Sequence, residues 1–100
     1  MKTKDEKSLT DYFEIRNIKW LYEILIDLEN NFIRTGVLRQ TKGEYTVAEL
    51  IAFVEKQNGM PDIISITFEA VPSGTKYVLG CDCYHGGGSF KRADFEPEKR

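Results

Sequence analysis

The sequence predicts an α+β fold in which two helices pack on one face of a small antiparallel sheet. Apolar residues recur at helical spacing over residues 9–34, a capping-box motif opens a second helix at Thr46, and apolar and polar residues alternate over residues 64–83. The expected order of elements is α–(β)–α–β–β, with a further short strand after it. Highly charged segments at 1–7 and 93–100 predict disordered ends, so that residues 8–92 form a single domain.

The first helix is expected from about Leu9 to Arg34. Ser8 and Asp11 resemble a capping box at its start, and Gly36 fits a C-terminal stop. One apolar row on this helix is formed by Ile18, Leu21, Leu25, Leu28 and Phe32. A second row beside it is formed by Ile15, Tyr22, Ile26 and Ile33. Together the rows span roughly 200°, about twice what one core contact needs, so the second row either lies between other elements or contacts another chain.

The second helix is predicted from Thr46 to Asn58. Thr46 and Glu49 form a capping box, in which each side chain accepts a hydrogen bond from the other residue's backbone N–H. Asn58-Gly59, followed by Pro61, ends the helical pattern. The segment before this helix, from Val37 to Tyr45, is expected to be a connection or a short strand pair with a turn at Lys42-Gly43.

A β-hairpin follows the second helix. Its strands alternate apolar and polar residues on either side of a turn at residues 72–75. The expected register places these residues opposite each other: Ala70 and Tyr77, Phe68 and Leu79, Ile66 and Cys81, Ile64 and Cys83. This register puts the apolar set on one face. Residues 89–92 are expected to return as a short third strand.

Composition narrows the classes of function. The 100 residues carry 14 Lys+Arg and 16 Asp+Glu, and this near-neutral balance without a basic block argues against nucleic-acid binding. No apolar run approaches the ~18 residues of a membrane span, and the first residues lack the apolar centre of a signal peptide. Two cysteines are too few for a disulfide scaffold, which favours a cytoplasmic location. No motif indicates a catalytic residue or a cofactor.

Cys81-x-Cys83-x-His85 is the most suggestive pattern for chemistry, because thiolate and imidazole are the ligands of soft metals. Alternate residues of an extended strand lie ~6.6 Å apart, whereas zinc ligands converge at ~2.0–2.3 Å from the ion. A metal site would therefore need a bulge. Otherwise the cysteines act as small hydrophobic residues of the core, with His85 at its rim.

The glycine run beside this pattern offers a second hypothesis. Backbone N–H groups of Gly86, Gly87 and Gly88 could bind an anion, with His85, Lys91 and Arg92 nearby to strengthen the attraction. A P-loop pattern is absent, and a flexible hairpin loop explains the same glycines. The acidic residues Glu23 and Asp27 are interpreted as part of a solvated helix face.

Two functions follow from these observations. The first is a small non-enzymatic protein-interaction domain of an accessory, immunity or inhibitor type, which associates with itself as a homodimer or with another protein. Its interface would be the row of Ile15, Tyr22, Ile26 and Ile33. The alternative is a small-ligand, anion or metal-binding domain centred on residues 81–88.

Overall fold

The α+β prediction is confirmed by a computed structural model, which describes residues 9–56, 60–83 and 87–94. Two helices, α1 (Ile18–Leu28) and α2 (Val47–Lys56), pack against an antiparallel sheet, and α1 is extended by a π-helical turn, η2 (Glu29–Ile33). The strands are β1 (Tyr12–Ile15), β2 (Leu38–Lys42), β3 (Ile63–Ala70), β4 (Lys76–Asp82) and β5 (Gly87–Arg92). Residues 1–8 and 95–100, which include most of the two ends expected to be disordered, lie outside the described residues.

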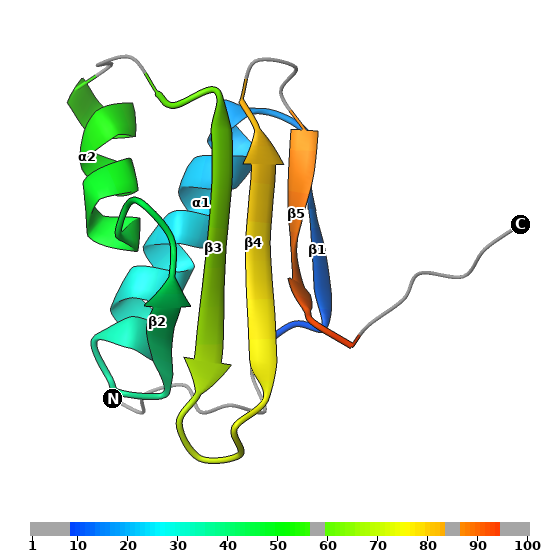
Figure 1. Ribbon diagram of the computed structural model, residues 1–100. Coiled ribbons are helices and arrows are strands. Elements are labelled where there is room, and N and C mark those ends of the chain that lie inside the picture. The colour runs from blue at the N-terminus through cyan, green and yellow to red at the C-terminus, as the bar shows by residue number, and fades with distance from the viewer. Residues whose placement is uncertain (1–8, 57–59, 84–86, 95–100) are drawn as a thin grey trace, which may run out of the picture.

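The five strands lie in the order β1-β5-β4-β3-β2 (Figure 1). Strands β3, β4 and β5 form a meander, while β1 and β2 occupy the two edges. Helix α1 connects those edges across one face of the sheet, and α2 joins β2 to β3. Neither helix in the described part of the chain is long and apolar enough to span a membrane.

The first segment corrects the expected start of the first helix at Leu9. Strand β1 comes first, and α1 begins at Ile18, where the Asn17 side chain accepts a hydrogen bond from the Trp20 N–H at 3.0 Å. Asn is a favoured N-cap residue, and Phe13 and Ile15 alternate with polar neighbours as strand residues do. The segment fits both a helical spacing and the alternation of a strand. Pairing with β5 favours the strand, because it gives this segment a neighbouring strand.

The wide apolar arc of the first helix is also explained by the fold. Ile15 belongs to β1, where it is only 1% exposed in the core, so it is not part of a helical surface row. Tyr22 lies on the α2 side of α1 and donates a hydrogen bond from its hydroxyl to Glu55 of α2 at 2.7 Å. Helix α2 therefore lies beside α1, and contact with α2 accounts for the Tyr22 side of the arc. Ile18, expected to face the core, is 49% exposed instead.

The second helix confirms its capping box. The Thr46 N–H donates to the Glu49 carboxylate at 2.8 Å, and the Glu49 N–H donates to the Thr46 hydroxyl at 3.1 Å. The expected end at Asn58-Gly59 lies outside the described residues. The preceding segment forms one strand, β2, which pairs with β3 and has an irregularity in register between Gln40 and Lys42.

The hairpin is present, but its register differs from the expected one by two residues. Phe68 lies opposite Tyr77 rather than Leu79, and Ile64 lies opposite Cys81 rather than Cys83. The Ala70 N–H donates to the Thr75 carbonyl and the Gly74 N–H donates to the Ala70 carbonyl, both at 2.8 Å. A shift of two residues preserves the face of every side chain, so apolar patterning alone could not detect it. The expected third strand is β5, which begins at Gly87.

Candidate functional site

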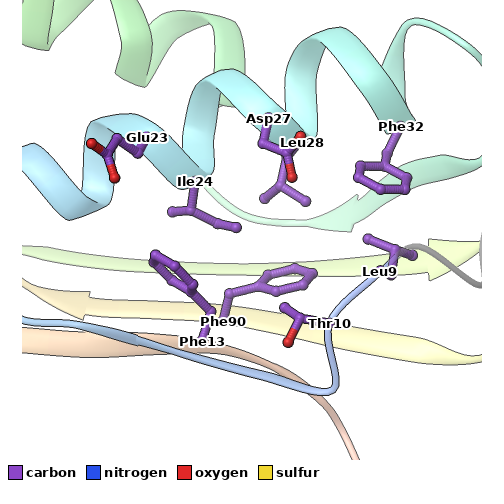
Figure 2. A pocket seen from close by; sticks show the side chains of 9 residues that line it. All are labelled: Leu9, Thr10, Phe13, Glu23, Ile24, Asp27, Leu28, Phe32 and Phe90. Atoms are coloured by element: carbon purple, nitrogen blue, oxygen red, sulfur yellow. The ribbon is translucent and has the colours of Figure 1, made fainter. Parts of the chain in front are cut away.

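A cavity of about 200 Å³ opens between α1 and the β1–β5 side of the sheet (Figure 2). We call it the α1–β1 cavity. It is lined by Leu9, Thr10, Phe13, Glu23, Ile24, Asp27, Leu28, Phe32 and Phe90. Because one wall is made by β1 and the segment just before it, the cavity could not be anticipated while that segment was assigned to a helix.

The walls of the cavity are mainly apolar. Figure 2 shows the rings of Phe13 and Phe90 on the sheet side, opposite Ile24 and Leu28 of α1. Phe90 is fully buried and stacks on Tyr77 with ring centroids 5.5 Å apart, which fixes the floor of the cavity. This arrangement suits an apolar side chain or a small apolar ligand, since burial of apolar surface is the main source of affinity in such a site.

Two carboxylates border the cavity on the α1 side. Glu23 and Asp27 lie one helical turn apart, as residues four apart on a helix must. Glu23 is exposed, whereas Asp27 is half-buried and accepts a hydrogen bond from the Asn31 amide at 2.5 Å. The sequence placed both on a solvated helix face. The fold adds an apolar cavity beside them, which favours a ligand that combines an apolar part with a positive charge.

Few polar groups line the α1–β1 cavity. Besides the two carboxylates, the side chains that line the α1–β1 cavity offer only the Thr10 hydroxyl as a polar group. Among the described residues, no three His, Cys, Asp or Glu side chains are grouped so that they could hold a metal ion.

Cys81 and Cys83 come together as the sequence did not predict. Their sulfur atoms lie 3.8 Å apart, because β4 ends at Asp82 and Cys83 enters a turn. The Cys83 N–H donates to the Asp62 carbonyl at 2.7 Å, which holds that turn against the start of β3. Burial raises the pKa of the Cys81 thiol to about 12, and burial together with Asp82 and Asp62 raises the pKa of Cys83. His85 lies outside the described residues.

The structure describes four residues of the anion hypothesis and does not bring them to one place: Gly87, Gly88, Lys91 and Arg92. Gly87 and Gly88 are strand residues of β5 that lie opposite Asp82 and Cys81, rather than parts of a flexible loop. Gly86 lies outside the described residues. Lys91 and Arg92 are consecutive in β5 and therefore point to opposite faces of the sheet.

Arg92 is engaged by carboxylates. Its guanidinium forms ion pairs with Asp11 at 2.8 Å and Asp94 at 2.5 Å. Comparisons of the chain with known family models, with curated proteins and with solved structures find no match.

Proposed function

We propose that this chain is a non-enzymatic protein-interaction domain that takes an apolar side chain of its partner into the α1–β1 cavity. The observation that supports this function is the cavity itself, which is apolar, open to the surface and bordered by Glu23 and Asp27. Protein interfaces concentrate their affinity where an anchoring side chain fills such a pocket. A basic residue next to the anchor would face the two carboxylates.

The surface beside the cavity extends this interface. Trp20 is 37% exposed, and its ring centroid lies 6.2 Å from that of Phe13, which lines the cavity. The guanidinium carbon of Arg16 lies 5.8 Å from the Trp20 ring centroid. Trp and Arg are enriched among the residues that dominate binding energy at interfaces. Filling the cavity with one apolar side chain contributes about 1.5–3 kcal/mol, so the partner also needs contacts on this neighbouring surface.

Self-association is the simplest form of this proposal, and a homodimer is expected. The row of Ile15, Tyr22, Ile26 and Ile33 is not a suitable interface, since Ile15 lies in the core and Tyr22 contacts α2. The surface around the α1–β1 cavity takes its place. Light scattering of the purified protein measures the mass, and a monomer at high micromolar concentration would remove self-association while leaving another protein as partner. We also propose a cytoplasmic location, because both cysteines are free.

Capped dipeptides test the cavity without knowledge of the partner. N-acetyl-Phe-Arg-amide should shift the NMR signals of Ile24, Leu28 and Phe13 at millimolar concentration, and N-acetyl-Phe-Glu-amide should bind more weakly. Glu23→Gln should weaken binding of the arginine peptide by about 1.5- to 5-fold, the range for an exposed ion pair. The matched control Glu44→Gln, an exposed residue just after the opposite edge strand β2, should leave binding unchanged. Equal binding of both peptides, or shifts elsewhere on the surface, would contradict the proposed site.

A further inference from the structure

We propose that Cys81 and Cys83 together bind one soft, thiophilic metal ion. The inference rests on the arrangement of the two thiols at the end of β4. It does not depend on the α1–β1 cavity, so either proposal can fail while the other stands.

The distance between the two sulfur atoms matches such a site. Two thiolates bound tetrahedrally at ~2.3 Å from a single zinc ion lie about 3.8 Å from each other. The Cys81 and Cys83 sulfurs lie 3.8 Å apart. No backbone rearrangement is therefore needed to bring both sulfurs to one ion.

The backbone around the pair fixes this geometry. Cys81 is held in β4 between Ile64 of β3 and Gly88 of β5. Cys83 is held by the hydrogen bond from its N–H to the Asp62 carbonyl. The backbone of both cysteines is thus held in place before a metal arrives, which lowers the entropy lost on binding.

The surroundings also favour a cation. Cys81 is 6% exposed and Cys83 is half-buried, so an ion can reach the pair from the Cys83 side. Asp82 precedes Cys83 in the chain, and Asp62 lies beside it through the hydrogen bond from the Cys83 N–H to the Asp62 carbonyl. Their negative charges attract a cation to the place where the thiolates form.

The ligand set indicates a soft metal. Thiolates select copper(I), zinc and cadmium over magnesium and calcium. Cys81 and Cys83 supply two positions of a four-coordinate ion, and among the described residues no third ligand is grouped with them. When a divalent ion binds, each S–H bond gives its proton to the solvent and each sulfur donates an electron pair to the metal. Two protons are therefore released for each ion bound, and no oxidant is required.

A cadmium titration of the reduced protein in oxygen-free solution tests the proposal. We expect one Cd²⁺ per chain, a thiolate-to-cadmium charge-transfer absorbance, and release of two protons in weak buffer. Cys83→Ser should lower the number of protons released from two to one, reduce the absorbance and weaken Cd²⁺ binding at least 10-fold. Its thermal unfolding curve verifies that the variant is folded. Ca²⁺, a hard ion of equal charge, should give neither the charge-transfer absorbance nor the release of protons.

Three results would overturn the proposal. The first is the absence of the charge-transfer absorbance at saturating Cd²⁺. The second is unchanged binding by folded Cys83→Ser, which would assign the ion to surface carboxylates. The third is one Cd²⁺ for two chains with a doubled mass in light scattering, which would show that Cys83 residues of separate chains share the ion.

Discussion

Replacing Gly88 by alanine should unfold the sheet at a temperature well below that of the parent protein. Gly88 lies in β5, opposite Ile15 of β1 on one side and Cys81 of β4 on the other. A Cβ atom at this position would lie 2.5 Å from the Cys81 Cα and would also overlap the Gly80 carbonyl oxygen. Because these are backbone atoms of the central strand, no change of rotamer can relieve the overlap.

The magnitude follows from the kind of atoms that collide. Overpacking a core typically costs about 1–3 kcal/mol when side chains can adjust. Since backbone of β4 would have to move here, we expect a loss of at least about 3 kcal/mol in the free energy of unfolding. For a domain of this size, that loss lowers Tm by at least ~12 °C.

The neighbouring glycine provides the matched control. A Cβ at Gly87 would make an ordinary contact, 3.8 Å from the Ile15 carbonyl oxygen. We therefore expect Gly87→Ala to change stability by no more than about 1 kcal/mol, and circular dichroism during urea unfolding measures both variants. If Gly88→Ala were as stable as Gly87→Ala, the conclusion that β5 and β4 lie too close at Gly88 to admit a Cβ atom would be refuted.

Two further predictions concern β1 and the open face of the sheet. Ile15→Ala should lower the free energy of unfolding by about 2–5 kcal/mol without changing the mass measured by light scattering. Replacing the exposed Ile18 by alanine should lower it by no more than about 0.5 kcal/mol. If Ile15→Ala changed the mass without a loss of stability, Ile15 would belong to an interface between chains. Arg39 and Lys76 hold the pKa of the Glu69 carboxyl below its usual 4.5, so its stabilising effect is present above that pH and is lost as the pH falls through the lower folded value. Glu69→Gln should therefore flatten the dependence of Tm on pH in this acidic range, Glu44→Gln should not, and parallel curves for Glu69→Gln and the parent would refute the assignment.

Local signals in the sequence predicted the parts of the fold that depend on local hydrogen bonds. Thr46 and Glu49 form hydrogen bonds with each other within one helical turn, so the start of α2 could be identified without knowledge of the rest of the chain. Gly36 likewise marks the end of the first helical segment, where its φ is +84°.

Features that depend on distant partners could not be predicted in this way. The β1 segment fits a helical period as well as a strand, and only its pairing with β5 decides between them. The α1–β1 cavity was therefore missed together with β1. The close approach of the Cys81 and Cys83 sulfurs was missed for a related reason. It depends on where β4 ends and on the backbone hydrogen bond from the Cys83 N–H to the Asp62 carbonyl.

The pairing of β1 with β5 also brings the two ends of the described chain together. The Arg92 N–H donates to the Asp11 carbonyl at 3.0 Å, next to the ion pairs that Arg92 forms with Asp11 and Asp94. A short linker could therefore join the segment after β5 to the segment before β1, while the chain is opened at the exposed turn between β3 and β4. Such a circular permutant would keep every strand beside its present neighbours. A folded permutant would show that strand pairing and packing, rather than the point at which the chain starts, specify this architecture.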